Sequence, residues 1–190
     1  EFREIDLKKE YKQIVLSYFR EEYLKGRTPN PCVVCNRNLK FGFLLSRAEE
    51  SGVEFDLFAT GHYARIDEIY GRYRLRKGLD ESKEQSYFLH AIKRERLAKT
   101  IFPLGSLTKA AAREIARRYG MEAADKLESQ DFISGGSYEV LFEKDDSRPG
   151  DIVTLDGKRV GGHRGIVNYT VGQRKGLGLS CARPMYVVAI

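Results

Sequence analysis

The stretch 26–37, which carries two prolines and two cysteines, constrains the fold of this chain more than any other. Pro29 and Pro31 fix their own φ angles and push the residues before them into extended conformations, so the segment is predicted to be stiff and non-helical. Apolar residues at helical spacing follow at once, at Leu39, Phe43, Leu44 and Ala48. Cys35 therefore lies at or just before a predicted helix N-terminus, where the helix dipole favours the thiolate and lowers the thiol pKa.

The three-position spacing of Cys32 and Cys35 suits several kinds of chemistry. Structural zinc would need four ligands, and the sequence holds neither a second cysteine pair of this spacing nor a closely spaced pair of histidines. Zinc and inert buried cysteines stay open as alternatives, and redox, persulfide or cluster chemistry is the main prediction. Cys181 precedes a strand-like run at 185–190 and is predicted to be a small core residue.

The composition is that of an ordinary globular protein, with 42% hydrophobic and 32% charged residues. The net charge of +6, with basic residues gathered at 113–118 and 158–175, permits a polyanionic partner and predicts weak, salt-sensitive binding to it. Three cysteines, an odd number, argue against a disulfide framework and favour a reducing, cytoplasmic location. No apolar run is long enough to span a bilayer, so no membrane partner is expected.

Apolar periodicity predicts two helices and then β-structure in the first half of the chain. One helix is predicted over 7–25, and the helix after the cysteines is predicted to end near Gly52. The run 53–60 predicts a short buried parallel strand. Residues 63–77 predict a β-hairpin with Gly71 in its turn, whose alternating arginines are typical of a solvated face. This order of elements predicts an α/β layer fold.

Turn and capping residues organise the second half. Ser82 is predicted to cap a helix, and 101–105 is predicted to be a linker at a domain boundary. Thr108 is predicted to cap a basic helix that runs through Tyr119. Period-two alternation predicts a second hairpin at 151–160, around an Asp-Gly turn.

Three motifs, in the same order along the chain, resemble the bacterial tRNA-specific 2-thiouridylase family: G-R-T-P-N-P-x-x-x-C-N-R-x-x-K-F, A-T-G-H-Y-A-R and K-x-Q-S-Y-F-L. The resemblance implies an α/β fold, namely the second half of a PP-loop (adenine nucleotide α-hydrolase-like) domain, then a small central α+β domain and the start of a C-terminal β-barrel. The domains are expected at 1–103, 104–180 (tRNA-binding) and 181–190. The chain is expected to be an internal piece of a longer enzyme, because it opens without Met and closes on a strand-like run.

The resemblance also implies a reaction. ATP with Mg²⁺ adenylates the C2 oxygen of the wobble uridine in tRNA, and a cysteine persulfide then delivers sulfur and displaces AMP. Cys35 matches the first catalytic cysteine, and Cys32 stands where family members often carry Asp. The implied partners are tRNA and a sulfur donor, such as a cysteine desulfurase or a sulfur-relay protein. The other implied contacts are Gly61 to ATP, and Asn30, Pro31, Cys32, His62, Lys83, Glu84 and Gln85 to tRNA.

The chain departs from the family pattern after Glu128-Ser129-Gln130, where a second catalytic cysteine is usual. No cysteine occurs here between Cys35 and Cys181. Cys32 then either resolves the Cys35 persulfide through a local disulfide or shares a 4Fe–4S cluster with Cys35. Residues 134–137 superficially resemble a PP-loop but follow no apolar strand, so this piece alone is not expected to consume ATP. Two other classes stay open: a tRNA-binding paralogue without thiolation activity, and a PP-loop enzyme that adenylates another substrate.

Overall fold

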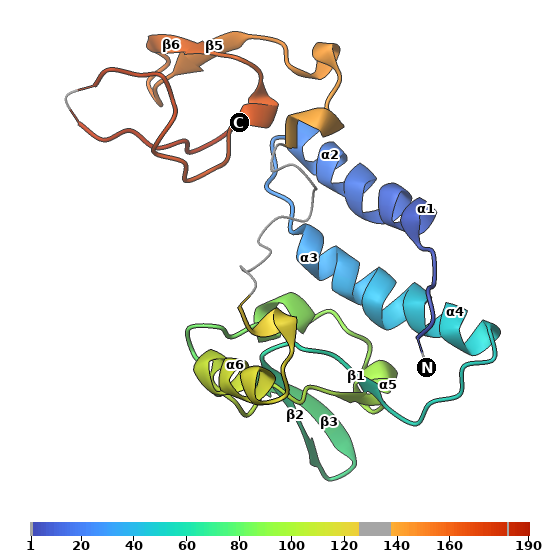
Figure 1. The fold of residues 1–190 in the computed structure, drawn as a ribbon. Helices are drawn as coiled ribbons and strands as arrows, with labels where there is room; N and C mark the ends of the chain where they lie inside the picture. Colours follow the sequence, from blue (N-terminus) through green and yellow to red (C-terminus); the bar gives the residue numbers. More distant parts are fainter. Residues whose placement is uncertain (1, 126–137, 182) are drawn as a thin grey trace. The chain divides into compact units, whose positions relative to one another are not determined.

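The computed structural model describes residues 2–125, 138–181 and 183–190 (Figure 1). The chain divides into two units, the first built from Glu1–Tyr11 and Cys32–Phe132 and the second from Lys12–Pro31 and Ile133–Ile190. None of the described helices is both long and apolar enough to cross a membrane. The Glu128-Ser129-Gln130 motif and the stretch 134–137 lie outside the described residues.

The helix predicted over 7–25 is confirmed as three consecutive helical elements, α1 (Lys8–Tyr11), η1 (Lys12–Leu16) and α2 (Ser17–Leu24). Gly26 ends this run with a φ of 68°, a value that glycine adopts without a Cβ clash. The N–H of Gly26 donates to the carbonyl of Tyr23 at 2.9 Å, which satisfies one of the last carbonyls of the helix.

The second helical run begins earlier than the prolines suggested. Its elements are α3 (Pro31–Val34), η2 (Cys35–Phe43) and α4 (Leu44–Glu50). Proline is favoured at the first helical position, because its fixed φ suits a helix and its missing N–H would be unpaired there anyway. Pro31 therefore starts the helix, and the prediction that the helix begins at or just after Cys35 is wrong.

The middle of this run, η2, is a π-helix of nine residues. The N–H of Leu44 donates to the carbonyl of Leu39, five residues back, as π-helical bonding requires. The wider turn changes which aromatic residue faces the core: Phe41 is 2% exposed, whereas Phe43, expected inward from a 3.6-residue period, is 40% exposed.

The predicted strand at 53–60 is reduced to β1 (Phe58–Ala59). It pairs in parallel with β4 (Thr100–Ile101), so the predicted parallel pairing is confirmed. The predicted burial is wrong in part, because Leu57 is 52% exposed. Among the described residues β1 has β4 as its only strand neighbour, and a two-stranded sheet leaves much of its surface uncovered.

The first hairpin is confirmed as β2 (Ala64–Ile69) and β3 (Arg72–Lys77). Tyr70 and Gly71 form its two-residue turn with φ values of 51° and 71°, the positive pair that a type I′ turn requires. This conformation costs a tyrosine about 1–2 kcal/mol, because its Cβ crowds the backbone. One face of the hairpin packs on the core of unit 1, whose buried members are Phe41, Ala64, Leu89, Ile92, Leu97 and Phe102.

The segment after this hairpin contains η3 (Ser86–Leu89) and α5 (Arg94–Leu97). Ser82 caps no helix: its hydroxyl donates to Asp80 at 2.6 Å, and η3 starts four residues later, so that prediction is wrong. Asp80 also accepts the backbone N–H of Ser82 at 3.1 Å, which closes a local turn, and that of Lys109 at 2.8 Å, which ties this segment to a distant part of the chain. The predicted linker at 101–105 is packed, since Phe102 is 8% exposed.

Helix α6 (Lys109–Arg118) confirms its predicted cap, because Thr108 Oγ1 accepts the N–H of Ala111 at 3.1 Å. The short η4 (Glu122–Ala124) follows it. Unit 2 contains η1 and α2 and, from residue 138 on, the described elements η5 (Tyr138–Leu141), η6 (Lys144–Asp146), β5 (Gly150–Val153), β6 (Arg159–His163) and η7 (Ile166–Asn168).

Strands β5 and β6 pair antiparallel and confirm the second hairpin. Within unit 2, helix α2 packs on the segment from residue 138 on, through an ion pair of 2.7 Å between Arg20 and Asp146 and a ring contact of 5.1 Å between Phe19 and Tyr138. The strand expected at 185–190 is absent from the described residues. That run is instead held by two backbone hydrogen bonds at Val187, too few to form a strand.

Gly105 tests how tightly the hairpin packs on the β4 segment. A Cβ at Gly105 would collide with the backbone carbonyl of Ala64, and the carbonyl of Gly105 accepts the N–H of Leu79 at 2.8 Å. Gly105→Ala is therefore expected to lower the free energy of unfolding by about 1–3 kcal/mol or more. Gly61→Ala is the matched control, because its new Cβ would meet only Leu104 at 3.6 Å. Urea denaturation compares the two variants, and equal stabilities would contradict this packing.

Candidate active site around Cys35

The helical run from Pro31 carries both cysteines of the candidate site. Cys32 is exposed and Cys35 is half-buried. Burial raises the pKa of the Cys35 thiol, the nearby Lys40 ammonium acts in the opposite direction, and a Cys32 thiolate would raise it further. The predicted low pKa of Cys35 is therefore wrong. Cys35 is the fifth residue of the run that starts at Pro31, beyond the first turn in which the helix dipole acts.

Tyr11 belongs to the surroundings of these thiols. Its own pKa is raised, first by burial and then by the charges of Cys35 and Cys32, which places the phenol near both sulfur atoms. A neutral phenol is a hydrogen-bond donor at neutral pH. In the sequence, Tyr11 is one of the apolar positions of the helix predicted over 7–25. Its spacing there does not distinguish it from a core residue.

His62 is held by a hydroxyl and by two aromatic rings. Thr60 Oγ1 lies 2.8 Å from His62 Nδ1, and the imidazole centroid lies 6.1 Å from that of Phe41 and 5.9 Å from that of Phe102. Burial, with a contribution from Lys40, lowers the pKa of His62 to about 4. The imidazole is thus neutral at pH 7. The exposed Lys40 ammonium thus contributes to the pKa shifts of both Cys35 and His62.

Asn36 and Lys40 are matched positions of the first family motif, but neither of them was predicted to have a role at the site. Lys40 follows Cys35 by five positions, which an α-helix would place on another face and which the π-helix η2 brings into register. Asn36 is 3% exposed and its Nδ2 donates to the carbonyl of Phe88 at 2.9 Å. Among the described residues its Oδ1 has no hydrogen-bond partner. An amide inside an apolar helical pattern is the signal that could have found it.

The predicted tRNA contacts at Lys83, Glu84 and Gln85 lie in the same unit. Gln85 pairs with Tyr63 twice, through its side-chain Oε1 at 2.9 Å and its backbone N–H at 3.0 Å. Glu84 Oε1 accepts the N–H of Ser86 at 2.6 Å. The Gln85 and Glu84 side chains therefore support the local fold, Lys83 is half-buried, and their roles toward tRNA stay predictions.

Three further predicted residues lie at the ends of elements. Gly61 is exposed just after β1, a position that leaves room for a ligand near its backbone. In unit 2 the backbone N–H of Asn30 lies 3.4 Å from Tyr18 Oη, and Pro31 opens α3. The contacts of these residues with ATP or tRNA stay predictions.

The side chains near Cys35 bear on whether the protein could hold an iron–sulfur cluster. In the ranges that the structure describes, no three His, Cys, Asp or Glu residues gather in a way that could hold a metal ion. Cys32 and Cys35 would supply two thiolates, whereas a 4Fe–4S cluster usually takes four cysteines. The residues present therefore do not fit a protein-held cluster, and no chemical step is derived through one.

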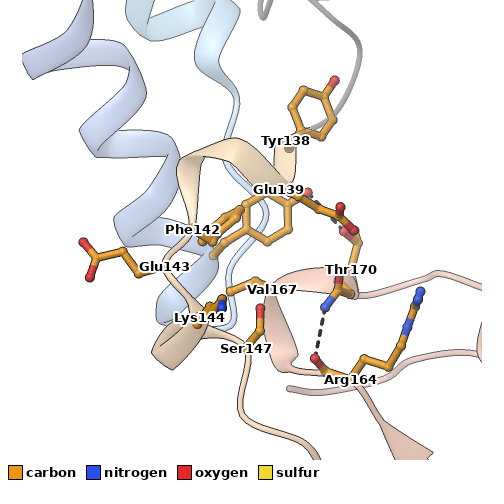
Figure 2. Close-up of a pocket in the computed structure, with 11 residues that line it drawn as sticks. Tyr138, Glu139, Phe142, Glu143, Lys144, Ser147, Arg164, Val167 and Thr170 are labelled. Carbon is orange, nitrogen blue, oxygen red and sulfur yellow. Dashed lines mark hydrogen bonds between the residues drawn. The ribbon is translucent and has the colours of Figure 1, made fainter.

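Unit 2 contains a cavity of about 620 Å³, and none of the predicted site residues lines it. Figure 2 shows Phe142 and Arg164 among the side chains that line it. The Asn168 side chain donates to the carbonyl of Arg164 at 3.4 Å. The Tyr23 ring meets Phe142 edge-on at 6.0 Å. Two acidic and two basic residues line the cavity, so it carries no net charge that would select a ligand.

Comparison with known proteins agrees with the motifs around Cys35. Residues 1–134 match the family model described as the tRNA methyl transferase HUP domain, and residues 139–190 match that of the tRNA methyl transferase PRC-barrel domain. The chain belongs to this family. The predicted fold class is confirmed as a HUP domain followed by part of a PRC-barrel domain, while the central α+β domain and the predicted domain limits stay predictions.

The similar curated proteins carry the name tRNA-specific 2-thiouridylase MnmA. The chain is 48% identical over 193 residues to MnmA 1 of Caldanaerobacter subterraneus subsp. tengcongensis, covering 98% of this chain and 52% of that protein. It is 47% identical to MnmA of Endomicrobium trichonymphae, covering 97% and 52%, and 45% identical to that of Syntrophomonas wolfei, covering 100% and 57%. The chain thus spans about half the length of these relatives.

Thiol reactivity tests the geometry of the three cysteines. Because burial raises the pKa of Cys35, its alkylation by iodoacetamide at pH 7 is expected to be several-fold slower than that of Cys32 or Cys181, which are exposed. Cys181 was predicted to be a small core residue, and its exposure shows that this prediction is wrong. Site-resolved peptide mass spectrometry between pH 6 and 10 gives the three rates. Cys35 as the fastest-reacting thiol at pH 7 would contradict the structure.

The pH dependence of stability tests the burial of His62. Its pKa of about 4 lies below the ordinary value of 6.5, so between these values the unfolded state binds more protons. The stability that His62 contributes is therefore complete above pH 6.5 and is lost as the pH falls toward 4. Urea denaturation across this range is expected to show a shallower pH slope for His62→Gln than for the native protein. His90→Gln, at an exposed imidazole, is the matched control, and equal slopes for His62→Gln and the native protein would refute the assignment.

Proposed function

We propose that this chain is part of a tRNA 2-thiouridylase, in which Cys35 carries the sulfur that replaces O2 of a uridine. The observation that supports this most is the half-buried thiol of Cys35 beside Tyr11 and Lys40, with a neutral His62 on which Lys40 also acts, in a chain of this family. The curated relatives bear the name tRNA-specific 2-thiouridylase.

The proposed reaction has two stages. ATP, bound with Mg²⁺, transfers AMP to the C2 oxygen of the wobble uridine and pyrophosphate leaves, which turns a poor leaving group into a good one. The terminal sulfur of a Cys35 persulfide then attacks C2, and AMP leaves with the former carbonyl oxygen. A persulfide is a stronger acid than a thiol, so the raised pKa of the resting Cys35 thiol does not prevent an anionic sulfur nucleophile.

The neighbouring side chains have distinct roles in this scheme. Lys40 favours the anionic sulfur, because its ammonium lies close enough to lower the pKa of Cys35. The neutral imidazole of His62 can donate or accept a hydrogen bond at the edge of the base without adding a positive charge. Tyr11 can donate a hydrogen bond from its phenol to the sulfur while keeping its proton. The predicted tRNA contacts of Asn30 and of the segment at 83–85 belong to the same proposal.

Cys32 completes the sulfur transfer. After the attack on C2, the sulfur–sulfur bond to Cys35 must break. The Cys32 thiolate attacks Cys35 Sγ, the new thiocarbonyl sulfur leaves with the bond's electrons, and a Cys32–Cys35 disulfide remains. A dithiol reductant must then restore both thiols before a sulfur donor reloads Cys35. The exposure of Cys32 supports this role, because both tRNA and a reductant need access to it.

The partners are set by this chemistry. The reaction needs tRNA, ATP and a sulfur donor, such as a cysteine desulfurase or a sulfur-relay protein, and we place it in the cytoplasm, where thiols stay reduced. Gly61, exposed after β1, is proposed to lie against ATP.

The decisive experiment replaces single cysteines in the full-length protein. Cys35→Ser is expected to abolish 2-thiouridine formation, because a hydroxyl cannot carry a persulfide, while tRNA affinity stays nearly unchanged. Cys32→Asp is expected to stop turnover, and Cys181→Ala is the matched control with activity retained. The readout is mass spectrometry of tRNA nucleosides from a thiolase-deficient host.

Other outcomes identify the alternatives. Native thiolation by Cys35→Ser would overturn the assignment of the sulfur carrier. A full-length protein that binds tRNA without thiolating it would be a binding paralogue. Release of pyrophosphate without 2-thiouridine would indicate that a different substrate is adenylated. Full activity of Cys32→Asp would overturn the resolving role of Cys32.

A further inference from the structure

The β2–β3 hairpin presents a strongly basic face to solvent. In an antiparallel pair, residues directly opposite each other share one face, so the register fixes both faces of this hairpin. The core-facing side carries Ala64, Ile66, Tyr73 and Leu75. The opposite face is formed by the pairs Arg65 with Arg76, Asp67 with Arg74, and Ile69 with Arg72.

This outer face has a net charge of +3, from four arginines less one aspartate. Asp67 is shared: it accepts from Arg74 at 3.0 Å and from Arg76 at 2.9 Å. These contacts hold the pKa of Asp67 at about 2, so it is ionised at pH 7 and the charge count stands. Arg72 is exposed beside the turn, and among the described residues it forms no ion pair.

Tyr70, at the tip of the hairpin, is not explained by folding. Its side chain is 99% exposed, so it gains no burial from the fold. Its φ of 51° is in the left-handed region, which asparagine, aspartate and glycine adopt more easily than tyrosine. A strained position at an exposed tip is a reason to look for a binding role. Figure 1 shows the turn projecting beyond α5 and α6 of the same unit.

We propose that this hairpin tip binds an unpaired stretch of RNA, with the ring of Tyr70 stacked on a nucleobase and Arg72 on an adjacent phosphate. Exposed aromatic rings are the surfaces on which unpaired bases stack, and guanidinium groups match phosphate geometry. Arginines at alternate positions of a strand recur about every 6.8 Å, which suits a repeating polyanion. That the RNA is tRNA rests on the function proposed above.

The stacking arm of the test uses Tyr70→Asn in the full-length protein. Asparagine suits the turn, so the melting temperature is expected to stay equal or rise. Affinity for tRNA and for poly(U), measured by fluorescence anisotropy, is expected to fall about 5- to 150-fold, the loss of one stacked base. The salt slope is expected to stay unchanged, because no charge is removed. Tyr186→Asn is the matched control at another exposed tyrosine, 54% exposed and outside the segment 104–180, and is expected to bind like the native protein.

The charge arm uses Arg72→Gln with Arg94→Gln as the matched control, an exposed arginine of α5. Arg72→Gln is expected to lower the slope of log affinity against log salt by about 0.7, the value for one phosphate contact to a single strand. Arg94→Gln is expected to leave that slope unchanged. An equal effect of both substitutions would show only a general charge effect and would overturn the local site.

The outcomes separate this proposal from the proposed enzyme function. Native tRNA affinity in Tyr70→Asn overturns the hairpin site even if the full-length protein makes 2-thiouridine. A five-fold or greater loss supports the site even if no 2-thiouridine forms. Tighter binding of poly-glutamate than of poly(U), lost in Tyr70→Asn, would indicate a protein-docking tip and overturn the RNA assignment. Absence of any RNA binding by the native protein overturns both proposals.

Discussion

The nine-residue π-helix η2 is the constraint on which the rest of unit 1 depends. Its i to i+5 bonding turns Phe41, rather than Phe43, into the core. The same change of register brings Lys40 to the side of the helix where it acts on both Cys35 and His62. An α-helix over these residues could still bury an apolar stripe, but positions five apart would face different ways. Packing and electrostatics at the candidate site therefore have one common cause, and long π-helical segments are rare enough to be associated with functional sites.

Burial shifts the pKa values of Cys35 and His62 in opposite directions, yet it leaves both groups uncharged. It keeps the Cys35 thiol protonated and the His62 imidazole neutral, because both charged forms lose solvation. The resting site therefore carries little charge apart from the ammonium of Lys40. Such a site stabilises a bound group that ionises to an anion, because the ammonium of Lys40 attracts it. A thiol of raised pKa is a poor nucleophile at neutral pH, which protects it from oxidation. A persulfide sulfur attached to it is more acidic and would ionise near the Lys40 ammonium.

Local signals in the sequence predicted the elements whose geometry depends on one or two residues. The hairpin turns and the Thr108 cap were predicted because positive φ values and a side-chain acceptor are properties of those residues alone. The start of the helix at Pro31 was missed, since proline both ends and begins helices and the choice depends on the residues after it. The pKa of Cys35 was missed for a different reason: burial is a property of the packed unit and not of spacing along the chain. Ser82 failed as a cap because Asp80, two residues earlier, captured its hydroxyl.

In the β2–β3 hairpin, folding determines the direction in which the side chains of the strands point, but it does not determine which residue occupies the turn. Once Ile66 and Leu75 face the core, alternation forces the residues between them outward, and a slip by one position would bury arginines and expose the apolar side. The outward direction of the arginines is therefore a consequence of folding, and their charge alone does not argue for a ligand. The register does not dictate a tyrosine at the turn. Any of several smaller residues would close the same turn with less strain, so Tyr70 is the residue whose presence calls for an explanation outside the fold.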